Sequence, residues 1–354
     1  MKVSLLITSL FLIFYSCNKK KENLFAPRII ESVNIQILLK DSILSIRAIE
    51  VGLKGDLSFA TSNGNLGGNI LTGEDERVAM SFQLKHDSLV PNFRSLAVTD
   101  SAAFALSIIS PSLLYKIDKD SIRLVYKETH EKAFYDSMDF WNDQEGIAIG
   151  DPTDDCMSVI ITRDGGETWR KLSCNILPKA KDGEAAFAAS DTNIAIVGDH
   201  TWVATGGKTS RILYSPDKGK SWQAFETPII QGKETTGIYS IDFYDALNGF
   251  GIGGDYTKAA DSSANKIRTQ DGGKTWQLVA ENKSPGYRSC LQYIPNRGGK
   301  ELVALGFEGI DYSNDSGVSW THLSDEGFYT IRFLNDSVAY AAGRGRIARL
   351  TFKK

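Results

Sequence analysis

Seven side chains that could do chemistry recur at one position of a repeated strand pattern. They are three arginines, two tyrosines and two carboxylic acids: Arg47, Arg94, Asp136, Glu184, Tyr239, Arg288 and Tyr329. Arginines bind carboxylates and phosphates through paired hydrogen bonds. If the strands surround a common axis, the three arginines converge at one end of it, and we expect them to hold an anionic group. The alternative is that the arginines and acids neutralise one another around a hydrated channel.

The same set contains a candidate catalytic arrangement. Tyr239 beside Glu184 could act as a nucleophile with its base, and Asp136 as a proton donor, which is the chemistry of a glycoside hydrolase. We favour the alternative, in which these side chains catalyse nothing and the chain is a binding protein. The two hypotheses differ in geometry. A hydrolase needs Glu184 and Tyr239 within hydrogen-bonding reach beneath a pocket, whereas acids that are already paired with arginines could not catalyse.

Three loops begin with related glycine and aspartate residues and then diverge. Loops on a rigid scaffold often carry binding residues, so we expect these loops to lie on the same face as the ring of side chains. The alternative is that the glycine and aspartate only start a turn. The candidate binding residues in these loops are Asp151, Asp199, His200, Trp202, Asp255 and Tyr256.

Metal and cofactor chemistry is poorly represented in the sequence. Asp151, Asp154 and Asp155 lack the spacing of a calcium-binding loop, and the four histidines have neither metal-ligand nor catalytic spacing. The glycine pairs lack the strand-then-helix setting of a nucleotide-binding motif. We therefore expect no metal and no cofactor. A net charge of -3 gives no general reason to expect nucleic acid as a partner.

An eight-residue repeat predicts the elements that position these side chains. Its pattern is Ser/Thr-x-Asp-x-Gly-x-Thr/Ser-Trp, and its aspartates follow one another at intervals of 53, 54 and 44 residues. The aspartate accepts backbone N–H groups of a turn, the glycine tolerates positive φ, and the tryptophan fills space beside the next strand. We expect each copy to close a β-hairpin and to serve folding rather than ligand binding. The copies contain Asp164 and Trp169, Asp217 and Trp222, Asp271 and Trp276, and Asp315 and Trp320.

Strand-like segments between these copies predict the blades of an all-β propeller. Four short antiparallel strands per unit, repeated every 40 to 50 residues, are typical of such blades. Two further units, near residues 45–60 and 93–117, have lost the repeat. We therefore predict seven four-stranded blades, with six or eight as alternatives. Residues 33–39 are expected to supply the missing outer strand of the last blade and so remove an open edge. The single propeller domain then spans residues 33–354.

The N-terminal residues predict export. Lys2 precedes an apolar run at residues 5–15, which is too short to span a bilayer as a stable helix. Ser16-Cys17 closes this run and looks like the lipobox of bacterial lipoproteins. An uncleaved anchor or an ordinary secretory signal is the alternative. We predict a signal peptide at 1–16, a lipidated Cys17 with a flexible tether at 17–32, and a monomer anchored in the cell envelope by its N-terminal lipid.

Cys156 and Cys174 lie almost symmetrically about the first copy of the repeat. The two cysteines could therefore face each other across neighbouring strands. Export would place them in an oxidising compartment, where a disulfide forms if their Cα atoms lie within about 7 Å.

The repeat resembles the Asp-box, or BNR, repeat of sialidase-like propellers. Longer segments resemble a bacterial family of exported propellers similar to the photosystem II stability/assembly factor, some of whose members are labelled oxidoreductases: residues 140–152, 183–190, 237–243, 253–256, 286–289 and 345–350. No redox cofactor motif accompanies them, and the Phe-Arg-Ile-Pro motif of sialidases is absent.

The resemblance covers about residues 40–352 and implies a non-enzymatic scaffold that holds another protein on an arginine-bearing face. Arg47, Arg94 and Arg288 are the residues to which we carry that role over. The expected partner is an envelope protein or an anionic glycan. The alternative function is a sialidase-like glycoside hydrolase of the Asp-box type.

Overall fold

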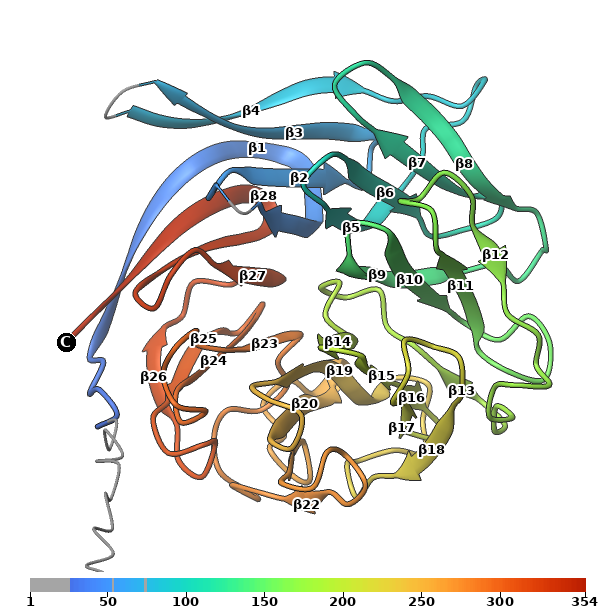
Figure 1. Cartoon of the computed structure of the whole chain (residues 1–354). Helices are drawn as coiled ribbons and strands as arrows, with labels where there is room; N and C mark the ends of the chain where they lie inside the picture. The colour runs from blue at the N-terminus through green and yellow to red at the C-terminus, as the bar shows by residue number, and fades with distance from the viewer. Residues whose placement is uncertain (1–25, 53, 73–74) are drawn as a thin grey trace, which may run out of the picture.

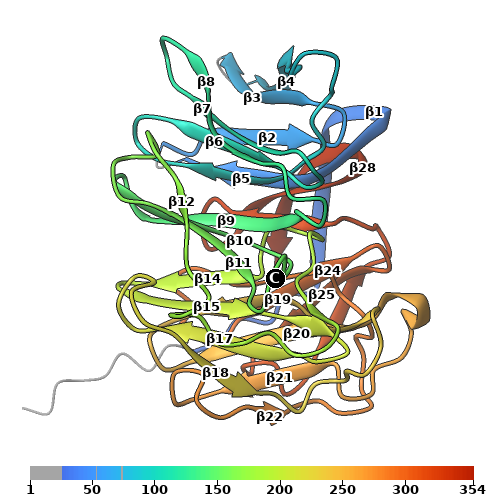
Figure 2. The same ribbon diagram turned by 90° about the vertical axis from the view of Figure 1, so that its right-hand side faces the viewer.

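The computed structural model describes residues 26–52, 54–72 and 75–354, and their strands form a ring (Figure 1). We call the space inside this ring the central channel, as in other propellers. Seen from the side, the sheets of neighbouring blades lie face to face (Figure 2). No helix of the described part is long and apolar enough to cross a membrane. The predicted signal peptide and Cys17 lie outside the described residues.

Six sheets of antiparallel strands make up the ring, and four of them have four strands each. These four sheets are β5 (Phe93–Val98), β6 (Ala103–Ser107), β7 (Ser112–Ile117) and β8 (Ile122–Glu128); β9 (Tyr135–Asn142), β10 (Glu145–Gly150), β11 (Ser158–Thr162) and β12 (Arg170–Lys171); β14 (Ile194–Val197), β15 (His200–Ala204), β17 (Arg211–Ser215) and β18 (Gln223–Glu226); and β23 (Cys290–Tyr293), β24 (Leu302–Gly306), β25 (Gly309–Ser313) and β26 (Thr321–Ser324).

The other two sheets have six strands each. One contains β19 (Thr236–Phe243), β20 (Gly249–Asp255), β21 (Lys266–Thr269) and β22 (Gln277–Leu278), extended by the short β13 (Glu184–Ala185) and β16 (Gly206–Gly207); a 3-10 helix, η1 (Tyr256–Lys258), follows β20. The other joins both ends of the chain: β27 (Thr330–Phe333), β28 (Val338–Lys353), β1 (Ser32–Val51), β2 (Leu57–Thr61), β3 (Asn65–Thr72) and β4 (Asp75–Gln83).

The prediction of seven blades is wrong, because the strands form a six-bladed propeller. The reason is the length of β1, which has 20 residues. Its first part pairs with β28, as predicted for residues 33–39, and its second part pairs with β2. The strands that were expected to form separate first and last blades are therefore one sheet.

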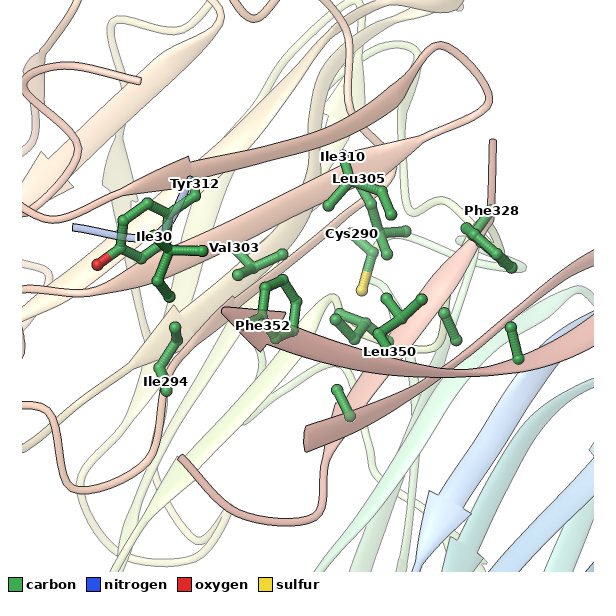
Figure 3. Close-up of a cluster of buried hydrophobic side chains, with 14 residues drawn as sticks. Ile30, Cys290, Ile294, Val303, Leu305, Ile310, Tyr312, Phe328, Leu350 and Phe352 are labelled. Carbon is green, nitrogen blue, oxygen red and sulfur yellow. The ribbon is translucent and has the colours of Figure 1, made fainter. Parts of the chain in front are cut away.

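Apolar residues from both ends of the chain close the ring. In Figure 3, Ile30 and Phe352 lie in one cluster, together with Cys290, Tyr312 and Leu350. All five are nearly or fully buried. Burying a large apolar side chain stabilises a fold by about 1.5 to 3 kcal/mol. The packing thus fastens the N-terminal segment to the last strands.

Each copy of the repeat forms the predicted turn, which we call a repeat turn. In the last one, the Asp315 carboxylate accepts hydrogen bonds from the backbone N–H of Ser319, 2.9 Å away, and from its hydroxyl group. Gly317 has a φ of +82° and sits against the Phe250 ring of the preceding blade. Trp320 packs edge-on to the same ring, with the ring centroids 5.9 Å apart. The repeat turns therefore fasten neighbouring blades to one another.

The disulfide between Cys156 and Cys174 is present, as predicted, with Cα atoms 5.5 Å apart and a sequence separation of 18. A cross-link over a loop of this length stabilises a fold by about 3 kcal/mol, mainly by restricting the unfolded chain. We expect the double substitution Cys156→Ser and Cys174→Ser to lower the free energy of unfolding by about that amount in urea titrations. A double variant as stable as the wild-type protein would contradict this expectation.

Candidate functional site

A segment at residues 186–193, which we call the channel segment, crosses the central channel instead of forming an inner strand. Its backbone carbonyl oxygens accept hydrogen bonds from several inner strands. Arg47 on β1 donates to Ala189 over 2.8 Å, and Arg94 on β5 donates to Ala188 over 3.2 Å. On the other side, the Thr330 hydroxyl group of β27 donates to Ser190 over 2.8 Å. The segment is thus tied to strands on different sides of the ring.

Asp191 anchors the channel segment with its carboxylate. One oxygen accepts a hydrogen bond from the Leu96 backbone N–H on β5 over 2.8 Å, and the other accepts from the Met138 N–H on β9 over 3.1 Å. Its own carbonyl oxygen accepts from Arg332 over 3.0 Å. The channel segment thereby divides the channel into two cavities, because residues on either side of Ser190 line different ones.

The first cavity, which we call the mouth pocket, has a volume of about 450 Å³. Arg47, Arg94 and Asp151 line one part of it, and aromatic rings line another. The Arg47 guanidinium lies over the Tyr329 ring, 3.8 Å from its centroid. This stacking orients the guanidinium plane while leaving charge available to a ligand.

Arg47 and Arg94 carry positive charge that no described carboxylate neutralises at ion-pair distance. The Nε atoms of both side chains are buried and have no hydrogen-bond partner. Burial, followed by the nearby Arg47 charge, lowers the pKa of Arg94 to about 10, and burial also lowers the pKa of Arg47. Both remain charged at neutral pH. An anion in the mouth pocket would be attracted by both charges, and each guanidinium has N–H groups besides Nε that can donate to it.

Two acids modulate this charge. Asp151 lies in the pocket wall, where burial raises its pKa to about 6 and its carboxylate accepts from the Ala186 backbone N–H over 2.8 Å. Asp136 is 0% exposed, and neither of its carboxyl oxygens makes a hydrogen bond of normal geometry. Burial, followed by the Asp151 charge, raises the pKa of Asp136 well above its usual value, while the Ala188 N–H and Arg94 oppose this. The raised pKa shifts Asp136 toward its neutral form, in which it does not neutralise the arginines.

Aromatic side chains outside the seven predicted at the recurring strand position form another part of the pocket. Tyr256 is 49% exposed and Phe307 is 43% exposed. The buried Tyr287 lies between them, 6.4 Å from the first ring and 5.4 Å from the second. Phe307 occupies the turn after β24, which corresponds to the loops after β10 and β20 that hold Asp151 and Tyr256. Inspecting that turn in every unit of the sequence would have found it.

The structure brings together five of the predicted ligand-binding residues and buries or displaces the others. Arg47, Arg94, Asp151, Tyr256 and Tyr329 all line the mouth pocket. Asp255 is buried instead, and its carboxylate accepts from the Thr257 N–H at the start of η1 over 3.0 Å.

Arg288, Glu184 and Tyr239 are engaged in internal bonds, and neither they nor Asp136 line the pocket. Arg288 forms a buried ion pair with Asp311 at 2.6 Å. Glu184 forms another with Arg211, also at 2.6 Å, and the Tyr239 hydroxyl group donates to the Thr235 carbonyl oxygen over 3.0 Å. Because Arg288 is already paired, two of the three predicted arginines line the pocket. Because Glu184 and Tyr239 are also paired, the arrangement that a hydrolase requires is not formed.

The predicted loop at Asp199, His200 and Trp202 lies in a different place from the other two loops. It follows the inner strand β14, and the Asp199 carbonyl oxygen accepts from the Lys218 N–H in a repeat turn over 2.8 Å. Trp202 is 0% exposed and stacks on Phe243 with centroids 3.7 Å apart. His200 shares a 2.6 Å hydrogen bond with the Tyr214 hydroxyl group. The channel segment has the small residues that are typical of an inner strand, so the sequence pattern predicted the first strand of this blade there. The true inner strand is β14, and each predicted strand of the blade therefore lies one strand too early.

The second cavity is smaller, about 200 Å³, and lies on the other side of the channel segment. Glu50, Asp139 and Asp242 line it around the buried Arg332, whose Nε donates to Glu50 over 2.6 Å. Burial raises the pKa of Asp139 to about 7 and that of Asp242 to about 6. Asp242 also accepts from the Tyr293 backbone N–H over 2.7 Å. Among the described residues, no group of three or more histidines, cysteines or acids could hold a metal ion.

No family model matches the chain, and no curated protein matches it in sequence. Solved structures do match it. One is described as YCF48, a photosystem II assembly factor, bound to D1 peptide: it is 12% identical with a TM-score of 0.62, covering 93% of this chain and 100% of that one. A streptogramin B lyase is 14% identical with a TM-score of 0.65, covering 91% and 98%. The WD40 repeats of RRP9 are 11% identical with a TM-score of 0.61, covering 93% and 99%.

These likenesses agree with the predicted resemblance to assembly-factor propellers at the level of the fold, whereas no match supports the Asp-box family label. The similar structures include binding and assembly propellers as well as a lyase. At such low identities they establish only that this chain has a fold similar to these β-propellers, one of which is bound to a peptide and one of which is a lyase.

Proposed function

We propose that this chain is a non-enzymatic binding propeller whose mouth pocket holds a carboxylate-bearing segment of a protein partner. The observation that carries the proposal is the pair of partly buried guanidinium groups, Arg47 and Arg94, which line the mouth pocket without a described carboxylate at ion-pair distance. A carboxylate can accept from both arginines, and each charge-assisted hydrogen bond contributes about 1.5 to 3 kcal/mol.

The aromatic part of the pocket fits a peptide better than a small inorganic anion. Tyr256 and Phe307 offer exposed ring surface beside the arginines, so an apolar side chain next to the carboxylate would be buried against them. The structure described as YCF48 bound to D1 peptide shows that a similar propeller holds a peptide. The internal pairing of Glu184 argues against the sialidase-like alternative.

A peptide array tests the proposal. Each amidated peptide carries either one glutamate or the matching glutamine, so that the two differ only in charge. We expect the domain to retain a subset of glutamate peptides and to release their glutamine counterparts. Uronic acid oligosaccharides form a second arm, because an anionic glycan could offer the same carboxylate. Equal binding of both peptide series, or turnover of a glycan, would overturn the proposal.

Affinity for the carboxylate should depend on pH through Asp151. Above its pKa of about 6 this group is ionised and repels an anion, whereas a ligand glutamate stays ionised down to about pH 4. We therefore expect the affinity to rise about threefold when the pH falls from 7.5 to 5.5. Calorimetric titrations check this, and Asp151→Asn should make the affinity independent of pH in that range. An unchanged pH dependence in the variant would contradict the role of Asp151.

We also propose that the protein acts outside the cytoplasm, as a lipoprotein anchored in the cell envelope. The Ser16-Cys17 motif motivates this proposal, and the disulfide between Cys156 and Cys174 supports an oxidising compartment. Metabolic labelling with a palmitate analogue should mark the wild-type protein and leave Cys17→Ser unlabelled. Recovery of an unlabelled protein that retains residues 1–16 would contradict the proposal.

A further inference from the structure

A third cavity, which we call the seam groove, adjoins the mouth pocket. It has a volume of about 660 Å³ and lies between β1 and β28. Phe307 and Tyr329 line both cavities, so the same two rings form the boundary between them. A ligand that fills the mouth pocket has a direct route into the seam groove across these rings.

β1 bends at the seam groove, where its pairing with β28 is irregular. Lys40 pairs with Arg346 and Ser45 pairs with Arg344, so residues 41–44 face Gly345 alone. Gly345 has a φ of +71°, and a Cβ atom there would come within 3.1 Å of the Asp41 carbonyl oxygen. Glycine thus permits the close approach at the bend. The bend places side chains of β1 and β28 on the two walls of one groove.

The seam groove is positively charged. Lys40, Arg344 and Arg346 line it, and no carboxylate does. Arg346 donates to Glu326 and to the Gly327 carbonyl oxygen, and its guanidinium lies 4.4 Å from the centroid of the Phe328 ring. Lys40 and Arg344 are exposed and form no ion pair with a described residue. Ile37, which is also exposed, adds apolar surface to the groove.

We infer that the seam groove is a second anion-binding subsite and that the partner is an extended acidic peptide. One carboxylate of this peptide binds Arg47 and Arg94, its chain crosses Phe307 and Tyr329, and a second carboxylate binds Lys40 and Arg344. The inference rests on the proposed function, because the mouth pocket must hold the first carboxylate. Two linked subsites bind with higher affinity than either alone when the spacing of the acids matches the groove.

Calorimetric titration of peptides with one or two glutamates tests the inference. The starting peptide binds the mouth pocket through one glutamate. A second glutamate is then placed in this peptide at increasing distances from the first. We expect one spacing to raise the affinity about tenfold. The double variant Lys40→Ser with Arg344→Ser should abolish this gain and leave the affinity for the one-glutamate peptide unchanged. The matched control is Lys220→Ser with Arg170→Ser, two exposed cations outside the groove, and it should retain the gain.

The outcomes separate the two claims. If no one-glutamate peptide binds, the proposed function fails. If one-glutamate peptides bind but a second glutamate adds nothing at any spacing, only the seam subsite fails. Vesicles with anionic lipids and a single-stranded oligonucleotide are titrated in parallel. Tighter binding of either one than of the two-glutamate peptide, lost in the Lys40 and Arg344 variant, would overturn the assignment of the groove to a peptide.

Discussion

Asp191→Ala is expected to lower the free energy of unfolding by about 4 kcal/mol, because two buried backbone N–H groups lose their acceptor and each costs about 2 kcal/mol. These groups belong to Leu96 on β5 and Met138 on β9, and they lie on different blades. The same substitution releases the channel segment, whose carbonyl oxygens accept hydrogen bonds from Arg47 and Arg94. The two arginines of the mouth pocket would then lose their support.

Urea titrations measure this effect, and Asp191→Asn provides the matched control. The asparagine amide has one oxygen, so it can accept one of the two N–H groups while its NH2 group opposes the other. We expect the control to lose about half as much stability as the alanine variant. If Asp191→Ala unfolds at the same urea concentration as the wild-type protein, the channel segment is held by other contacts and this account of it is wrong.

Gly317→Val is expected to destabilise the fold by a similar amount, about 4 kcal/mol. Two costs combine at this position. The positive φ of +82° is strained for a β-branched residue, which costs about 2 kcal/mol, and overpacking costs about 2 kcal/mol more. The overpacking arises because any side chain at this glycine overlaps the Phe250 ring, which is 0% exposed and held against Trp320.

Gly198→Val separates the two costs. Gly198 also has a positive φ, +60°, but a side chain there meets no atom within 4 Å. We expect this control to lose only the conformational part, about 2 kcal/mol in thermal or urea unfolding. Equal losses in the two variants would show that the repeat turns do not fasten one blade to the next.

Strands with a clear alternating pattern could be predicted from the sequence. The unit expected near residues 93–117 contains β5, β6 and β7, and the four repeat turns form where the pattern placed them. The number of blades could not be predicted, because β1 continues through a bend at residues 41–44 and pairs on both sides of it. The hydrophobic pattern of a strand shows which face is buried, but not which strands are its partners.

The candidate site could be predicted in part for a similar reason. The positions of Arg47, Arg94 and Tyr329 follow from the predicted starts of their inner strands. Arg288 occupies the corresponding position, but its side chain turns to Asp311 on β25, a long-range pairing that a sequence pattern does not contain. Glu184 was misplaced because residues 186–193 have the small side chains of an inner strand but cross the channel.

The most direct test of the central claim is the affinity of a glutamate peptide for a variant that lacks both pocket arginines. We expect Arg47→Gln combined with Arg94→Gln to weaken binding about 100-fold in calorimetric titrations, because two charge-assisted contacts are lost. The matched control is Arg170→Gln on β12, an exposed residue outside the pocket, which should bind as the wild-type protein does. If the double variant folds and binds the peptide with unchanged affinity, the mouth pocket does not hold the carboxylate.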